Sequence, residues 1–317
     1  MKTLHIVPHD VDLSFISKRL IYFAVSGFLI LASIGLVLTK GLNFGIDFKG
    51  GILVEVRTDG PADIGAMRDQ LSTLGLGEIS LQEFGLPTDV LIRIQRQEGD
   101  GDAQNQAVAL VQQTLGEGVE YRRTEFVGPK VSQELLQDGI LAVGLAMAAI
   151  LVYIWFRFEW QFGIGAIIAL IHDIILTIGI FALLGLEFNL STVAAVLTIA
   201  GYSINDTVVV FDRVREKLRK YKSMELPELL NFAINRTLSR TVMTSVTTLI
   251  ALSALFFLGG EVIRDFSFAM IWGVVVGTYS SICIAVPVLL YLGLDERARG
   301  NMDGSNEDGP QSQADRP

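Results

Sequence analysis

A chain of 317 residues with 50% hydrophobic and only 19% charged side chains has a mean hydropathy of +0.47, which excludes an ordinary soluble domain. Its formal net charge of −9 argues against a nucleic-acid partner, and its single cysteine, Cys283, excludes an internal disulfide or a thiolate metal site. We therefore predict a membrane protein that binds neither a metal nor another cofactor.

The apolar residues are concentrated in six runs, each close to or above the roughly 20 residues that cross about 30 Å of hydrocarbon as a helix. The first run could be a secretory signal peptide, but it is longer than the usual apolar region and lacks a convincing cleavage site, so we interpret it as a retained anchor. The fold class predicted is membrane α-helical with six transmembrane helices, over 20–38, 139–156, 162–185, 189–211, 240–258 and 266–292.

The long segment between the first two runs, residues 39–137, has the patterns of a small α+β domain. Four stretches alternate apolar and polar residues as half-buried strands do, and two stretches resemble amphipathic helices that end at glycine. The order is β-α-β-β-α-β, which predicts a ferredoxin-like domain. The strands are expected at 52–57, 78–84, 89–95 and 119–127, and the helices at 61–75 and 101–116.

Lysine and arginine side chains predict the orientation, because they stay on the cytoplasmic side in short loops. They gather in the N-terminal segment 1–19, between the fourth and fifth runs, and after the sixth run. Both termini are therefore expected in the cytoplasm, and 39–137 outside it. The second to sixth membrane helices are expected within 138–297. We also expect a short surface helix within 221–239, and a disordered tail over 298–317.

Asp206 is the most informative polar residue, because an acid at membrane depth costs at least about 2.5 kcal/mol and usually faces a protein interior. Ser203, Asn205 and Thr207 flank it and could orient its carboxylate or a water molecule. An acid near a helix end, solvated by lipid headgroups, is the alternative interpretation. The later Asp212 lies among arginines and is expected to form an ion pair at the interface.

Arg240, at the start of the fifth run, is the candidate counter-charge for Asp206. It begins a polar stripe typical of a hydrated helix interface rather than of a lipid-facing surface, made of Thr241, Thr244, Ser245, Thr247 and Thr248. A topology anchor whose charge extends to the membrane surface is the competing interpretation.

Two further features lie inside the apolar runs. His172 and Asp173, near the middle of the third run, could form a proton relay, or one of them could fix a neighbouring helix by a hydrogen bond. Gly273 and Gly277 form a small-xxx-small pattern, for which tight helix packing is the favoured interpretation.

The sequence contains no nucleotide-binding loop and no metalloprotease or serine-hydrolase motif, so we do not expect an enzyme. A membrane acid with a nearby arginine instead favours proton movement. One charge that crosses the membrane potential yields about 2.3 kcal/mol per 100 mV, enough to shift a conformational equilibrium.

Four motifs in this order resemble the SecF family of the bacterial SecD/SecF protein-export complex, within the resistance-nodulation-division superfamily. They are GLNFGIDFKGG (41–51), FRFEWQFGIGAIIALIHDI (156–174), GYSINDTVVVFDRVRE (201–216) and NRTLSRTVMTSVTTL (235–249). The resemblance covers about residues 15–295.

The resemblance implies an inner-membrane subunit that pairs with SecD, associates with the SecYEG channel and uses the proton motive force to promote export of preproteins. It implies that the acid of the family's NDT motif is Asp206 and that the arginine of its SRT motif is Arg240. An assembly scaffold for SecD and the channel is the main alternative, and a small-molecule exporter ranks last. Proton and sodium coupling stay open alternatives.

Overall fold

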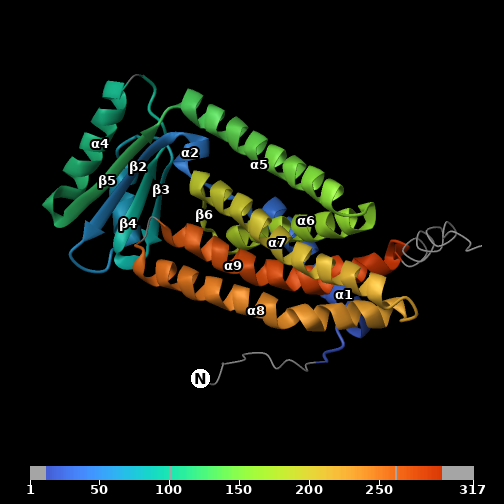
Figure 1. Cartoon of the computed structure of the whole chain (residues 1–317). Coiled ribbons are helices and arrows are strands. Elements are labelled where there is room, and N and C mark those ends of the chain that lie inside the picture. Colours follow the sequence, from blue (N-terminus) through green and yellow to red (C-terminus); the bar gives the residue numbers. More distant parts are fainter. Residues whose placement is uncertain (1–11, 100, 261–262, 295–317) are drawn as a thin grey trace, which may run out of the picture.

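The computed structural model describes residues 12–99, 101–260 and 263–294. It consists of a bundle of long helices with an α/β domain at one end (Figure 1). Within the described residues, six helical segments are long and apolar enough to span a membrane. The tail predicted over 298–317 and most of the N-terminal segment 1–19 lie outside the described residues.

The bundle helices extend beyond the apolar runs. A short 3-10 turn, Ile16–Lys18, precedes α1, and a π-helical segment, Ser281–Ala285, follows α9 and leads into α10 (Val286–Val288) and a 3-10 turn (Leu289–Tyr291). The sixth span is therefore not one regular α-helix. The long helices are α1 (Arg19–Lys40), α5 (Pro129–Arg157), α6 (Trp160–Leu184), α7 (Leu190–Lys220), α8 (Leu226–Leu258) and α9 (Arg264–Ser280).

The separate surface helix predicted within 221–239 is not present. The polar segment from Leu226 onward is instead the first part of α8, so α8 begins well before the apolar run at 240. The reason is an apolar stripe at helical spacing, which the polar composition of the segment conceals. Leu226, Leu229, Leu230, Ala233 and Ile234 of this stripe are all buried in a core cluster.

The α/β domain is a four-stranded antiparallel sheet with strand order β3-β4-β2-β5. Two helices cover one face, where Ile52, Val54 and Ile92 are fully buried with Leu71 and Val111. The elements are β2 (Gly51–Thr58), α3 (Ile64–Ser72), β3 (Ile79–Phe84), β4 (Leu86–Ile94), α4 (Gly101–Leu115) and β5 (Val119–Val127).

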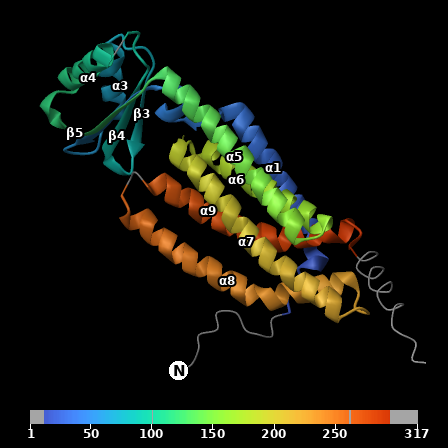
Figure 2. The same cartoon turned by 45° about the horizontal axis from the view of Figure 1, so that its top comes forward.

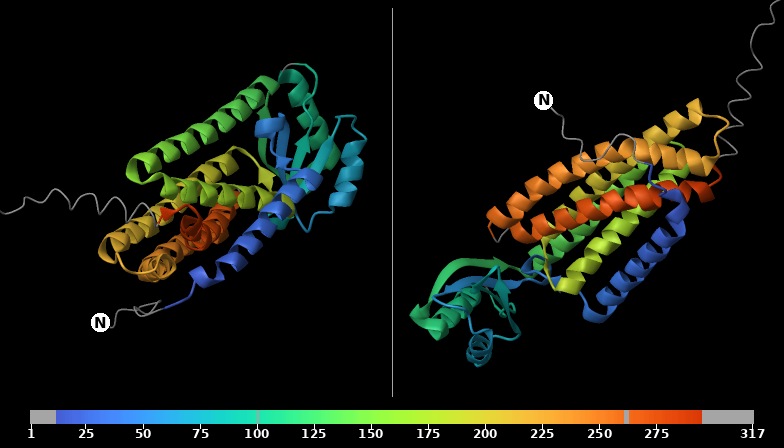
Figure 3. Two further views of the ribbon diagram at one scale, coloured as in Figure 1. Left: turned by 90° about the vertical axis from the view of Figure 1, so that its right-hand side faces the viewer. Right: turned by 90° about the horizontal axis from the view of Figure 1, so that it is seen from below.

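The helices of the bundle differ in how much of their surface is covered. α1 and α8 lie at opposite edges, and α9 passes through the interior between α7 and α8 (Figures 2 and 3). The span that includes α9 is the most buried of the six, whereas α1 and α5 leave most of their apolar side chains exposed, and α8 exposes apolar side chains mainly in its C-terminal part. Exposed apolar surface of this extent is expected of helices that contact lipid or other membrane helices.

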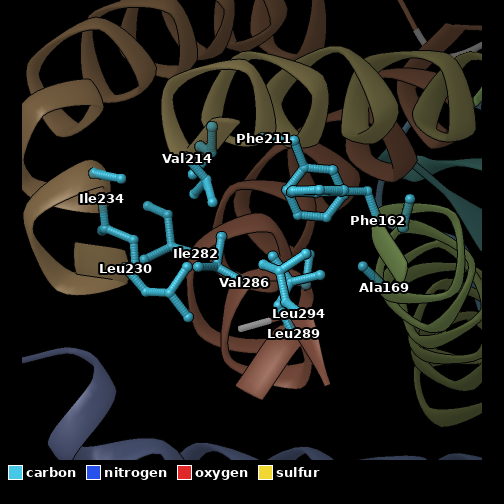
Figure 4. Packing of buried hydrophobic residues seen from close by; sticks show 14 of the residues in the cluster. Phe162, Ala169, Phe211, Val214, Leu230, Ile234, Ile282, Val286, Leu289 and Leu294 are labelled. Atoms are coloured by element: carbon cyan, nitrogen blue, oxygen red, sulfur yellow. The ribbon is translucent and has the colours of Figure 1, made fainter. Parts of the chain in front are cut away.

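The largest core cluster lies at the end of the bundle away from the α/β domain. Phe162 of α6 and Phe211 of α7 point toward one another, with ring centroids 5.0 Å apart (Figure 4). Leu230 of α8 lies on the opposite side of the same cluster, near Ile282 and Val286 (Figure 4). This packing joins α6, α7 and α8 to the segment that follows α9.

α7 and α9 approach each other closely because α9 has glycine at the contact. A Cβ atom added at Gly273 would lie 2.3 Å from Ile199 of α7, and one added at Gly277 would lie 3.1 Å from Ser203. The predicted packing role of these two glycines is therefore confirmed. Their small size brings the polar side chains of α7 and α9 into direct contact.

Candidate functional site

Asp206 lies in the interior of the bundle, on the part of α7 that faces α8 and α9. Its side chain is almost fully buried, and its Oδ2 atom has no hydrogen-bond partner. The hydroxyl of Thr278 on α9 is the hydrogen-bonding neighbour of this carboxylate, and Thr278 in turn contacts Ser245 of α8 at 2.7 Å. Asp206 is therefore enclosed by hydroxyl groups but incompletely paired.

The predicted counter-charge does not form an ion pair with this acid. Arg240 is exposed on α8, and no nitrogen of its guanidinium lies within 4.0 Å of an Asp206 oxygen. Its charge nevertheless acts electrostatically on Asp206. Asp212, six residues further along α7, forms the expected ion pair, with Arg157 at 2.7 Å.

The three residues that flank Asp206 in the sequence have other partners. Ser203 donates to Asp173, the Thr207 hydroxyl contacts Ser281 at 2.8 Å, and Asn205 is exposed. Neighbours in a helical sequence point in different directions, so adjacency to Asp206 does not give contact with it. The orienting hydroxyl comes from α9 instead.

Asp173 is the centre of a second buried polar cluster, between α6, α7 and α9. Its Oδ2 atom accepts hydrogen bonds from Ser203 at 2.5 Å and from Ser280 at 2.8 Å. Its Oδ1 atom lies 2.9 Å from Nδ1 of His172. Asp173 therefore joins three helices, which agrees with the expectation that one member of this pair fixes a neighbouring helix.

Five consecutive residues at the junction of α9 and the π-helical segment, 277–281, connect the two acids. Thr278 faces Asp206, Ser280 donates to Asp173, and Tyr279 lies beside His172 with ring centroids 6.0 Å apart. The π-helical segment begins at Ser281, and π-helical turns are frequent at functional sites. This segment was not predicted, although the polar run GTYSS inside an apolar region was a visible signal.

A third polar cluster fixes the α/β domain to the end of the bundle. Arg93 of β4 forms an ion pair with Glu187 and donates to Asn43 at 3.2 Å. Glu187 and Asn43 belong to a short parallel strand pair, β1 (Asn43–Phe44) and β6 (Glu187–Phe188). The pairing was missed, although both segments have the pattern G-L-x-F, at 41–44 and 185–188.

This cluster lies directly at the N-terminus of α7. Asp47 accepts a hydrogen bond from the Leu190 backbone N–H at 2.8 Å, and Asn189 and Thr192 form a capping box. The first turn of the helix that contains Asp206 is therefore attached to the segment that leads into the α/β domain. At 1.5 Å per residue, the distance along α7 from Leu190 to Asp206 is about 24 Å.

The family models match most of this architecture. The model for the C-terminal region of the protein-export membrane proteins SecD and SecF matches residues 107–295, and the model for the SecD/SecF GG motif matches residues 35–62. A SecF subunit of protein translocase from Rickettsia bellii is 46% identical over 90% of this chain and 95% of its own length. The chain belongs to the SecF family. The corresponding subunit from Cereibacter sphaeroides is 47% identical over 92% of this SecF-family chain and 93% of its own length.

Two solved structures of SecDF have the same architecture. A crystal structure of SecDF from Thermus, described as a translocon-associated membrane protein, has a TM-score of 0.83 at 36% identity and covers 90% of this chain. SecDF in a super-membrane-facing form has a TM-score of 0.64 at 33% identity over 93% of this chain. The SecF-family chain spans only 39% and 40% of those two chains. Family and fold together identify a multi-pass membrane protein with an accessory role in Sec protein translocation.

The GG motif has a structural explanation in this chain. Gly50 and Gly51 both have positive φ angles, and a Cβ atom added at Gly51 would lie 2.7 Å from the Ile94 carbonyl oxygen. Side chains at both positions would strain the backbone, and one at Gly51 would also clash with β4. The pair therefore allows the chain to enter the centre of the sheet directly from the segment next to the bundle.

Proposed function

We propose that this chain couples the proton motive force to Sec-dependent protein export, with Asp206 as the group that binds and releases the proton. The observation that carries the proposal is the buried Asp206 carboxylate, which has one oxygen without a partner and no ion pair. A carboxylate buried in this way is costly when it is ionised. Binding of a proton therefore lowers the free energy of the helix arrangement that buries it.

Arg240 supplies the electrostatic bias in this mechanism. It lies outside ion-pair distance of Asp206 and is exposed, so it can approach or withdraw as neighbouring helices move. When Asp206 is ionised, attraction to Arg240 favours the approach of α7 and α8, and protonation removes that attraction. The proton thereby shifts the equilibrium between two arrangements of the helices.

α7 provides a mechanical connection to the α/β domain. We assign this domain, whose elements follow the order β-α-β-β-α-β, to the ferredoxin-like type and to the extracytoplasmic side, with both termini in the cytoplasm of a bacterial inner-membrane protein. A shift of α7 moves its N-terminus, where Asp47 and Glu187 attach the domain. Proton binding at Asp206 thus becomes a displacement of the domain that meets the preprotein.

SecD is the partner that we propose for the exposed faces of α7 and α8. Small or polar residues recur along the exposed side of α7 at helical spacing: Ser191, Ala194, Thr198, Gly201 and Asn205. Close packing of membrane helices uses such residues, and lipid would leave Asn205 and Arg240 poorly solvated. The named SecDF structures, in which this chain corresponds to only part of a longer chain, support the choice of SecD. On the basis of the same assignment, we propose the SecYEG channel and the translocating preprotein as further partners.

The test compares Asp206→Asn with Asp212→Asn in membrane vesicles that contain SecD and SecYEG, with a pH gradient imposed across the membrane. Asp206→Asn is expected to abolish gradient-dependent stimulation of export while it still co-purifies with SecD. Asp212→Asn makes the same chemical change at an exposed ion pair of the same helix and is expected to retain stimulation.

Two outcomes would contradict the coupling role. Normal stimulation by Asp206→Asn would favour an assembly scaffold, provided that the variant still binds SecD and the channel. Stimulation by a sodium gradient in place of the pH gradient would assign another ion to the same carboxylate.

A further inference from the structure

His172 has a buried nitrogen atom that the proposed function does not use. The imidazole is 1% exposed, and its Nε2 atom has no hydrogen-bond partner, whereas its Nδ1 atom lies 2.9 Å from Asp173. Buried polar atoms are almost always paired. An unpaired ring nitrogen next to an acid therefore requires an explanation.

The surroundings of Asp173 determine the state of the imidazole. Oδ2 accepts hydrogen bonds from two serine hydroxyls, Ser203 and Ser280, which suits an ionised carboxylate. An ionised Asp173 can only accept, so His172 must donate from Nδ1. In the neutral ring, Nε2 then carries the lone pair and is the atom that can accept a proton.

The net negative charge of the His172–Asp173 pair favours binding of a proton at Nε2. With neutral His172, the pair has a net charge of −1 in a buried position, and no lysine or arginine forms an ion pair with Asp173 in the described part of the chain. Transfer of a proton from a hydronium ion to Nε2 forms one N–H bond, breaks one O–H bond of the donor and releases water, while the Nδ1–H bond stays intact. It converts the pair into an imidazolium beside a carboxylate, with no net charge.

Within the part of the chain that the structure describes, the groups that face this cluster do not supply a competing cation. α9 contributes Tyr279, the π-helical segment contributes Cys283, and α1 contributes Tyr22 and Ser26, whose hydroxyl contacts Tyr279 at 2.9 Å. On α7, Asp206 lies one helical turn from Ser203. The nearest group that can balance the charge of Asp173 is therefore His172 itself.

We infer that Nε2 of His172 is a second proton-binding site of this chain, separate from Asp206. When the imidazole is charged, its attraction to Asp173 strengthens, and the carboxylate is drawn from Ser203 and Ser280. The hydrogen bonds that join α6 to α7 and α9 then weaken. This inference rests on the proposed function in one respect only, that movement of α7 drives export.

Direct observation of the ring is the principal experiment. The chain has three histidines, so His5→Gln and His9→Gln leave His172 as the single histidine. Nitrogen-15 NMR of the full-length, histidine-labelled protein in lipid nanodiscs then reports both the tautomer and the charge of this one ring. We expect the Nδ1–H tautomer at pH 8.5 and the doubly protonated ring as the pH falls toward 5, and we expect Asp173→Asn to abolish this transition.

A ring that stays neutral throughout this pH range, or that carries its hydrogen on Nε2 at pH 8.5, would overturn the inference. The same spectra of Asp206→Asn separate the two proposals. A His172 transition that persists in Asp206→Asn supports a second site, even if the export assay refutes the role of Asp206. Loss of the transition in that variant would overturn the claim that the sites are separate.

His172→Asn is the matched variant for function. Its amide nitrogen can replace Nδ1 as the donor to Asp173, but no atom replaces the basicity of Nε2. We expect a wild-type melting temperature together with loss of the pH dependence of export between pH 6 and 8. A variant with the wild-type pH profile would contradict the inference.

Discussion

Asp173 and Asp206 are two buried acids on neighbouring helices, but their surroundings are opposite. Asp173 is bonded through both oxygens, to His172, Ser203 and Ser280. Asp206 has an oxygen without a partner and faces an arginine that is too distant for an ion pair. A fully bonded carboxylate stabilises one arrangement of helices, whereas an incompletely bonded carboxylate leaves a second arrangement accessible.

The same contrast separates Asp206 from the acids outside the membrane helices. Asp89 forms an ion pair with Arg57 at 2.6 Å, and Glu187 forms one with Arg93. Each of these acids fixes a particular contact, one within the sheet and one between the domain and the bundle. Among the buried acids of the described chain, Asp206 is the one that has an oxygen without a partner and no ion pair, which is why we propose it, and not the others, for the change of charge.

The largest expected effect is the loss of stability on removing Asp173, which tests whether this acid, rather than Asp206, holds the helices together. Asp173→Ala leaves His172 Nδ1 and the Ser203 hydroxyl without an acceptor and leaves Ser280 only the Gly277 carbonyl, so we expect a loss of about 3 kcal/mol or more in the free energy of unfolding. Asp206→Ala removes a poorly paired group, and its effect should stay within about 1 kcal/mol. Reversible denaturation in mixed micelles measures both, and equal losses would end the distinction between the two acids.

The next effect concerns the attachment of the α/β domain. Arg93 and Glu187 are both largely buried, so removing either side chain should cost about 2 to 3 kcal/mol, and a double-mutant cycle should reveal coupling between them. The exposed pair Arg123 and Glu125 is the control, for which the expected coupling is about 0 to 1 kcal/mol. Equal coupling in both pairs would show that burial does not strengthen the attachment.

A smaller effect is expected where α7 and α9 meet. Gly273→Ala would push a methyl group against Ile199, so we expect a loss of about 1 to 2 kcal/mol and a disturbance of both acids. Gly201→Ala, on the exposed side of α7, meets no atom within 4 Å and should not destabilise the isolated chain. Melting of the two variants measures the difference. If SecD packs on this side, Gly201→Ala should weaken co-purification with SecD although the isolated chain melts normally.

Much of the bundle could be predicted because long apolar runs leave few alternatives to membrane helices. The ends of the helices were less predictable, since α8 starts with a polar segment whose burial depends on contacts with distant residues such as Phe211 and Ile282. Composition detects hydrophobicity, but it does not detect a narrow apolar stripe within a polar segment.

The candidate site was only partly predictable, for a geometric reason. Asp206, His172 and Asp173 stand out because an ionisable side chain is rare inside an apolar run. Their partners Thr278, Ser280 and Ser203 are small hydroxyl residues that are common in membrane helices, and which acid each one meets depends on how α7 and α9 pack. The attachment of the α/β domain was missed because two-residue strands such as β1 and β6 leave almost no periodic pattern.

The smallest effect is a pH dependence in the α/β domain, where an acid has a fixed partner. The hydrogen bond from the Arg57 guanidinium holds the pKa of Asp89 below its usual range, and the same pair raises the pKa of Arg57. A lowered folded-state pKa gives stability that is complete above the unfolded value of about 4 and is lost as the pH falls through the folded value. Amide hydrogen exchange of β2 and β4 in the full-length chain, corrected for intrinsic rates, should therefore accelerate below about pH 4.

Asp89→Asn should be less protected at neutral pH and should lack this additional acid-dependent loss. Glu125→Gln, at an exposed pair, should behave as the wild type does, because water screens that interaction. An identical acid response in Asp89→Asn and wild type would place the titrating group elsewhere and would remove Asp89 from the acids that fix a contact.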